Sequence, residues 1–163
     1  MSTEYGHLRV VHKRQRFEIP RISISYSRKQ NGYDRTYIRS SEELYHLCMS
    51  IWDSETIDLY EEFKVIFFDR SLSVIGYRNL GRGGVSGVIV EIRHILVIAL
   101  ECNASSFVIV HNHPSGNLTP SRQDVSLTNK LQQGANLLDL KLQDHLILTS
   151  QGYYSFIDEG IIE

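Results

Sequence analysis

Four consecutive apolar residues, Phe107–Val110, constrain the fold of this chain more than any other segment. A short, uninterrupted apolar run is typical of an interior strand, which is covered on both faces of its sheet. Apolar residues recur with helical spacing on either side of it, in Val90–Cys102 and in Pro120–Leu137. Because strands and helices alternate along the chain, the sequence predicts an α/β fold with a mixed β-sheet flanked by helices.

The remaining elements are expected from periodicity and from turn-forming residues. A helix capped by Ser40 or Ser41 runs to about Trp52. The segments expected as strands, of which the first two form a hairpin, are Phe17–Ser27, Tyr33–Ile38, Glu61–Phe68, Ser73–Leu80, Leu140–Thr149 and Tyr153–Ile157. We expect two parts in the 163-residue chain: a strand-rich N-terminal extension, residues 1–40, and one domain, residues 41–163.

The composition excludes several classes of protein. A hydrophobic fraction of 42% and a charged fraction of 22% are near globular averages, which excludes wholesale disorder and a long coiled coil. The apolar runs are too short to cross a bilayer, and the first residues do not resemble an export signal. Cys48 and Cys102 form no CxxC pair, which argues against a disulfide scaffold or a cysteine zinc site. We therefore expect a soluble, cytoplasmic protein with no membrane partner.

The N-terminal extension is basic, although the formal net charge of the whole chain is −2. Only Glu18 and Asp34 oppose the bases in this stretch, which are Arg9, Lys13, Arg14, Arg16, Arg21, Arg28, Lys29, Arg35 and Arg39. Such a surface can bind phosphate, which makes DNA a candidate partner. The alternative is a solvated sheet edge whose charges prevent pairing with another edge. We favour this alternative, because no recognition helix or aromatic platform is recognisable there.

Two histidines, His111 and His113, directly follow the interior strand. Residues two apart in an extended chain point to the same side, so both imidazoles can bind one metal ion. Pro114 then ends the strand, and Gly116 permits a tight turn. The sequence therefore predicts a metal site at the end of this strand.

The start of the next helix is expected to place a carboxylate close to the two histidines. Thr119 and Pro120 are the expected N-cap and first helical residue, which places Ser121 and Asp124 together on the first turn. Two histidines and Asp124 leave tetrahedral zinc a fourth position for water, as in catalytic sites. The alternative is that Ser121 and Asp124 form only a capping box and that the histidines are polar residues at a strand end. The joint pattern favours metal binding.

A hydrolytic zinc site also needs a base for its water. Strand periodicity places Glu61 on the apolar face of Phe63 and Val65, and Glu62 on the face of Lys64. Glu61 is thus the acid expected to point inward, where desolvation raises the pKa of a carboxyl group. A solvated acid at the start of a strand remains the alternative.

His145 lies in the strand Leu140–Thr149, on the face of Lys141, Gln143 and Ile147. It can orient one of the ligand histidines, or it can be an ordinary strand histidine. The sequence leaves both interpretations open.

The segment from His111 to Asp124 resembles the JAB/MPN family of JAMM metalloproteases, whose pattern is Glu, then H-x-H, seven residues and S-x-x-D. The letters HNHPSG are closer still to the RadC-like branch, which often carries a DNA-repair label. The resemblance extends from about Asp58 to Ile157, and it aligns Glu61 with the family's acid.

This resemblance implies a cytidine-deaminase-like fold that holds one Zn²⁺ through His111, His113, Asp124 and a water. It implies Glu61 as the general base and Ser121 as a hydrogen-bond donor to the oxyanion. We expect a zinc-dependent peptidase or isopeptidase acting on a peptide or protein substrate. The alternative is an accessory protein of DNA repair or recombination, which binds DNA or a replication partner and whose metal site is structural or of unknown activity.

Overall fold

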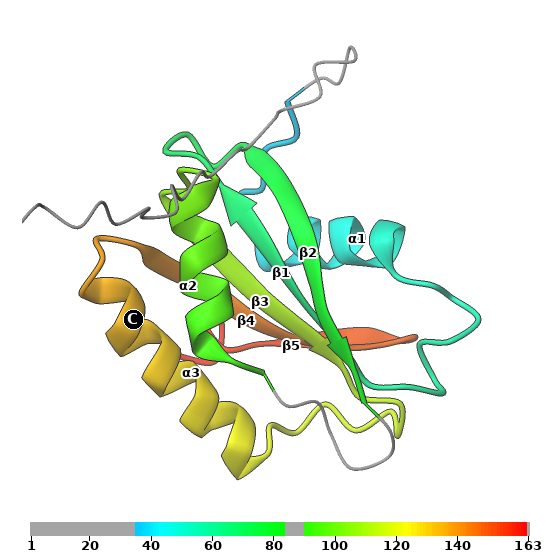
Figure 1. Cartoon of the computed structure of the whole chain (residues 1–163). Coiled ribbons are helices and arrows are strands. Elements are labelled where there is room, and N and C mark those ends of the chain that lie inside the picture. The colour runs from blue at the N-terminus through cyan, green and yellow to red at the C-terminus, as the bar shows by residue number, and fades with distance from the viewer. Residues whose placement is uncertain (1–34, 84–89, 163) are drawn as a thin grey trace, which may run out of the picture.

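The computed structural model describes residues 35–83 and 90–162 (Figure 1). Over these residues, one five-stranded sheet has the order β2-β1-β3-β4-β5. The elements are α1 (Ser41–Ile51), β1 (Glu62–Phe68), β2 (Val74–Arg82), α2 (Ile92–Glu101), β3 (Ser106–Asn112), α3 (Arg122–Asn136), β4 (Lys141–Thr149) and β5 (Gly152–Ser155). The predicted α/β fold with a mixed sheet flanked by helices is confirmed.

The direction of the strands brings the end of β3 close to the start of α3. β1 runs antiparallel to both β2 and β3, β3 and β4 are parallel, and β5 is antiparallel to β4. Two parallel neighbours need a crossover connection, and α3 provides it between β3 and β4. The chain leaves the carboxyl end of β3, turns, and re-enters a helix there (Figure 1).

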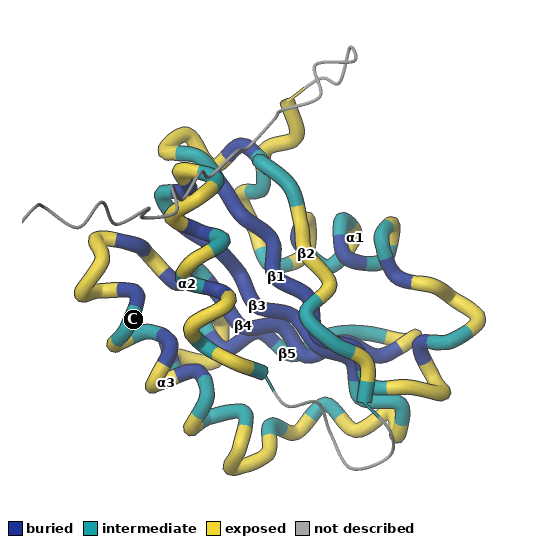
Figure 2. Tube along the Cα trace, viewed as in Figure 1, coloured by how far each residue is buried: buried dark blue, intermediate teal, exposed yellow. Residues whose placement is uncertain are grey.

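Helices cover both faces of the sheet: α2 and α3 lie on one face and α1 lies on the other (Figure 1). β1 and β3 are consequently buried along their whole length (Figure 2). Phe107 and Ile109 belong to the core under α2 and α3, whereas Val108 and Val110 belong to the core under α1. The apolar run that predicted an interior strand thus contributes alternate side chains to two separate cores.

One strand boundary differs from the sequence prediction, and one strand pairing predicted at the N-terminus falls outside the described residues. β3 continues to Asn112, so His111 lies within the strand, paired with Phe63 of β1, rather than after it. Tyr37 forms an isolated antiparallel bridge with Ser73. The strand predicted at 17–27, most of the basic stretch and nearly all of the extension at 1–40 lie outside the described residues.

In the described part of the chain, no helix combines the length and the apolar character needed to span a bilayer.

The start of β1 carries a buried ion pair on the face that α1 covers. Glu62 and Lys64 are only 3% and 4% exposed, and the Glu62 carboxylate pairs with Lys64 and with Arg82, whose Nε lies 2.7 Å from Oε1. The Lys64 ammonium lies 3.8 Å from the ring centroid of Trp52, a cation–π contact. Periodicity assigned the inward direction to Glu61, but Glu62 is the buried acid and Glu61 is only partly buried. Glu62 is buried because α1 covers this face of the sheet as well, and the direction of the Glu61 side chain towards the other covered face stays a prediction.

Two opposing effects determine the pKa of Glu62. Burial on its own raises the pKa, but the hydrogen bonds and charges of Lys64 and Arg82 outweigh it and hold the pKa below its ordinary value. The stability that this pairing contributes is therefore present above the ordinary carboxyl pKa. It is lost as the pH falls through the lowered value.

We predict that Glu62→Gln lowers the free energy of unfolding by about 3 kcal/mol near neutral pH, because it leaves the Lys64 charge buried and unpaired. Urea unfolding followed by circular dichroism measures this loss. The matched control is Glu91→Gln, which removes the acid of an exposed pair 3.7 Å from His94 and should cost less than about 1 kcal/mol. Equal losses in the two variants, or a loss at Glu62 that persists in strong acid, would contradict the prediction.

Candidate metal centre

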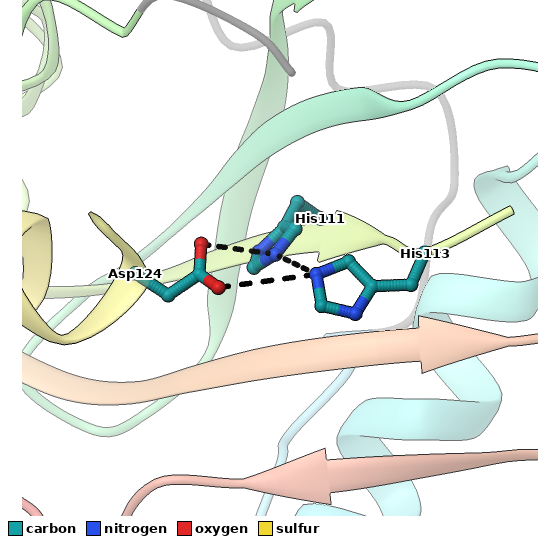
Figure 3. Close-up of side chains that lie close together, drawn as sticks. All are labelled: His111, His113 and Asp124. Atoms are coloured by element: carbon teal, nitrogen blue, oxygen red, sulfur yellow. Dashed lines mark hydrogen bonds and ion pairs between the residues drawn. The ribbon is translucent and has the colours of Figure 1, made fainter. Parts of the chain in front are cut away.

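His111 and His113 present their imidazoles to the same side of the end of β3 (Figure 3). Their Nε2 atoms are 3.0 Å apart. His111 is buried against Phe63, whose ring stacks on it at a centroid distance of 5.7 Å, and His113 is partly buried. The prediction that strand spacing aims both rings at one point is confirmed.

The connection from β3 to α3 is a tight turn. Gly116 has a φ of +77°, a left-handed conformation that favours glycine, and its N–H donates to the carbonyl of His113 at 3.0 Å. His113 Nδ1 lies 2.6 Å from the carbonyl oxygen of Asn117. Since a carbonyl only accepts, Nδ1 carries the proton, and a neutral His113 directs the lone pair of Nε2 towards His111.

Ser121 is the N-cap of α3, not Thr119 as the sequence suggested. The Ser121 hydroxyl accepts the N–H of Asp124 at 3.2 Å, and Asp124 Oδ2 accepts the N–H of Ser121 at 2.6 Å. The N–H of Thr119 instead donates to Asn117 Oδ1 at 2.9 Å, within the preceding turn. The cap lies two residues later than expected because Ser121 and Asp124 satisfy each other's backbone reciprocally.

The carboxylate of Asp124 faces the histidines and caps its helix at the same time (Figure 3). Oδ1 lies 3.3 Å from His111 Nε2, and Oδ2 lies 3.9 Å from His113 Nε2. The capping box and the metal ligand, which the sequence offered as alternatives, are therefore compatible in one residue. The cap holds the carboxylate in the orientation that faces the two rings.

The three side chains fit the requirements of a metal ion. One ligand atom from each of His111, His113 and Asp124 lies within 4.8 Å of the others. Zinc bonds of about 2.0–2.1 Å in tetrahedral geometry separate neighbouring ligand atoms by about 3.3 Å. The distance of 3.0 Å between the two imidazole nitrogens and that of 3.3 Å from His111 Nε2 to Asp124 Oδ1 are close to this value, and the other carboxylate oxygen lies 3.9 Å from His113 Nε2. Two imidazoles with one carboxylate are also a donor set that zinc accepts in catalytic sites.

The charge state of His111 suits a ligand. Burial lowers its pKa to about 4, the nearby Asp124 carboxylate opposes this shift, and His113 adds to it. A ligand imidazole must be neutral, and His111 is neutral near physiological pH.

Asn112, between the two histidines, is a site residue that the sequence analysis missed. Its side chain accepts the N–H of Glu62 at 2.7 Å and donates to the carbonyls of Ile57 and Tyr60 at 2.6 and 2.8 Å. The residues on both sides of Glu61 are therefore tied to β3 through one amide. The signal was present in the sequence, because a polar side chain in an interior strand must find buried partners on the face opposite to its neighbours.

The backbone of Glu61 immediately precedes β1, at the end of the sheet that carries the candidate centre. Phe63 pairs with His111 in the antiparallel register, and extending this register by two residues would set Glu61 opposite His113. The carbonyl of Glu61 accepts the N–H of Gly83 at 2.8 Å. The role of the Glu61 carboxylate as a base stays a prediction.

His145 lies directly behind His111. It is fully buried, and its Nε2 is 2.8 Å from His111 Nδ1. An irregularity in the pairing of β3 with β4 sets Phe107 opposite Leu142 and Val108 opposite Asp144. Gln143 is skipped, so Leu142 packs in the same core as Ile147, not on the face of Asp144 as strict alternation predicted.

A cavity of about 600 Å³ lies on the α1 side of the sheet, where Ser40, Leu44, Asp144 and Tyr153 contribute to its lining. None of the three candidate ligands lines it. The cavity and the candidate metal centre are thus separate features of the fold.

Comparison with known proteins agrees with this architecture. The family model of the RadC-like JAB domain matches residues 38–161. A "UPF0758 protein" of Flavobacterium johnsoniae is 45% identical over 102 residues, which cover 63% of this chain and 44% of that protein. A relative of the same name from Thermotoga maritima is 38% identical over 122 residues, or 74% of this chain and 53% of that protein.

The UPF0758 protein YkfG of Escherichia coli is 37% identical over 102 residues, or 63% of this chain and 65% of that protein. The chain spans about half the length of the curated relatives from Flavobacterium and Thermotoga. The family match, in contrast, covers most of the chain and includes all three candidate ligands. The chain therefore belongs to the RadC-like JAB domain family.

Proposed function

We propose that this domain is a zinc-dependent peptidase or isopeptidase of the JAMM type, which hydrolyses an amide bond with a metal-bound water. The observation that carries the proposal is the convergence of His111 Nε2, His113 Nε2 and the Asp124 carboxylate within 4.8 Å. When bound there, zinc supplies a water whose pKa is lowered to about 7 and a Lewis acid for a carbonyl oxygen. Three protein ligands are typical of a catalytic rather than a structural zinc site.

Glu61 is the group that we assign to proton transfer. Extending the β1–β3 register by two residues from the Phe63–His111 pair would set Glu61 opposite His113, and Asn112 ties the neighbouring residues Tyr60 and Glu62 to β3. A base must reach the proton that it removes, so a fixed backbone at this position favours the role. The buried Glu62 is committed to Lys64 and Arg82, which supports Glu61 as the acid used for chemistry.

Ser121 is the group that we assign to stabilisation of the oxyanion. Its oxygen accepts the N–H of Asp124, and this bond does not use the hydroxyl hydrogen. That hydrogen can be donated to the oxygen of an attacked amide carbonyl. The helix cap would hold the hydroxyl beside the ligand Asp124 throughout the reaction.

We predict that the purified domain binds about one zinc per chain, and that His113→Ala and Asp124→Asn each lose it. Asp124→Asn keeps an oxygen that can cap α3 but removes the negative charge, so it separates the ligand role from the capping role. Elemental analysis after dialysis measures the metal, and thermal unfolding checks that the variants remain folded. Full zinc content in a folded Asp124→Asn variant would remove Asp124 from the ligand set.

We predict that Glu61→Gln retains zinc but lowers hydrolysis by about 10²–10⁴-fold, because it removes a base and not a ligand. A peptide-library cleavage assay, run with and without chelator, measures the activity. A nuclease assay and the salt dependence of DNA binding, run beside it, test the alternative that the chain acts on nucleic acid. Unchanged cleavage by Glu61→Gln would show that another group serves as the base.

A further inference from the structure

A chain of buried hydrogen bonds begins at the backbone of the candidate ligand Asp124. The hydroxyl oxygen of Thr128, one turn later on α3, lies 2.7 Å from the carbonyl oxygen of Asp124. A carbonyl oxygen can only accept a hydrogen bond, so Thr128 donates its single hydroxyl hydrogen there. Thr128 is completely buried, and towards any further partner its oxygen can only accept.

The second link fixes the proton of His145. The Nδ1 atom of His145 lies 2.6 Å from the Thr128 oxygen. Because that oxygen has no hydrogen left to donate, Nδ1 must carry the proton. His145 is fully buried, stacked on Phe156 at a centroid distance of 4.5 Å and in contact with the ring of His111, an environment that favours the neutral imidazole. A neutral imidazole has one N–H, so Nε2 of His145 is an acceptor.

The third link fixes the proton of His111. Its Nδ1 atom lies 2.8 Å from Nε2 of His145, which accepts, so Nδ1 of His111 is the donor. Nε2 of His111 therefore bears a lone pair, and this is the atom that faces His113 and Asp124. The direction of all three hydrogen bonds follows from two facts, the inability of a carbonyl to donate and the single N–H of a neutral, buried His145.

We infer that Thr128 and His145 are positioning residues that hold His111 in the tautomer required of a metal ligand. This inference rests on the metal site of the proposed function and adds the device that prepares it. Outer partners of ligand histidines generally fix the tautomer and the ring orientation in this way. Here the series of hydrogen bonds runs from Asp124 through Thr128 and His145 to His111. It therefore connects the helix and the strand that carry the ligands.

Without the Thr128 hydroxyl, the hydrogen bond between His145 and His111 could reverse its direction. His145 could then carry its proton on Nε2 and donate to Nδ1 of His111, which would place the His111 proton on Nε2. A protonated Nε2 cannot bind metal, so the His111 proton would have to move back to Nδ1 before the metal could bind. The consequence is a weaker site with all three ligands still present.

The test compares Thr128→Val, which removes the hydroxyl and nearly keeps the shape, with Thr128→Ser, which keeps the hydroxyl. Zinc affinity, measured by competition with a chelator, should fall by about 10–100-fold in Thr128→Val and stay close to wild type in Thr128→Ser. Long-range ¹H–¹⁵N NMR of the metal-free protein reports which ring nitrogen is protonated. It should show a proton on Nδ1 of His111 in the wild type and in Thr128→Ser, and a shift of that proton towards Nε2 in Thr128→Val.

Two results would overturn the inference. One is a wild-type spectrum with the His111 proton on Nε2, a readout that needs no variant and so stands even if Thr128→Val fails to fold. The other is wild-type zinc affinity in a folded Thr128→Val protein. A wild-type chain that binds no zinc would instead overturn the proposed function, while the tautomer assignment is decided by the NMR spectrum of the metal-free protein alone.

Discussion

The coverage of β3 on both faces is the constraint on which the site depends. A strand buried on both sides leaves no polar side chain exposed to water, so each polar group at its end must be paired within the protein. His111 and His113 meet this requirement on the α3 side, where they face each other and Asp124. Asn112 meets it on the other side, where it pairs with the backbone of the segment that enters β1. The tripeptide His111–His113 thereby provides two ligand candidates and, in Asn112, a side chain that fixes the backbone before β1.

The start of α3 combines structural and chemical tasks in the same atoms. Ser121 and Asp124 close a capping box, an interaction that contributes about 1 kcal/mol to a helix, and the Asp124 carboxylate also faces the two imidazoles. Thr128, one turn later, extends the connection to His145 and so to His111. A shift of this helix relative to the sheet would disturb the carboxylate and the histidine proton together. The helix start therefore controls the geometry of the candidate centre and the protonation of its ligand.

Much of the site could be predicted from sequence because its signals are local. Strand spacing placed His111 and His113 on one side, and the S-x-x-D spacing brought Asp124 to the first turn of a helix. What the sequence missed depends on contacts between elements. Glu62 is buried because α1 and Trp52 at its end cover the second face of β1, a contact that strand periodicity does not reveal. Asn112 gave a local signal of polarity, but its partners Ile57 and Tyr60 lie more than fifty residues earlier.

The sequence by itself determined the class of the fold, the family and the chemical identity of the three ligand candidates, because periodicity and short spacings act within a few residues of chain. Only the tertiary structure decided the outer partners. Gln143 is skipped in the pairing of β3 with β4, which turns His145 towards His111, and packing of α3 on β4 brings Thr128 within 2.6 Å of the other nitrogen of His145. Contacts of this kind depend on the register and the distance between elements, which no local pattern of residues encodes.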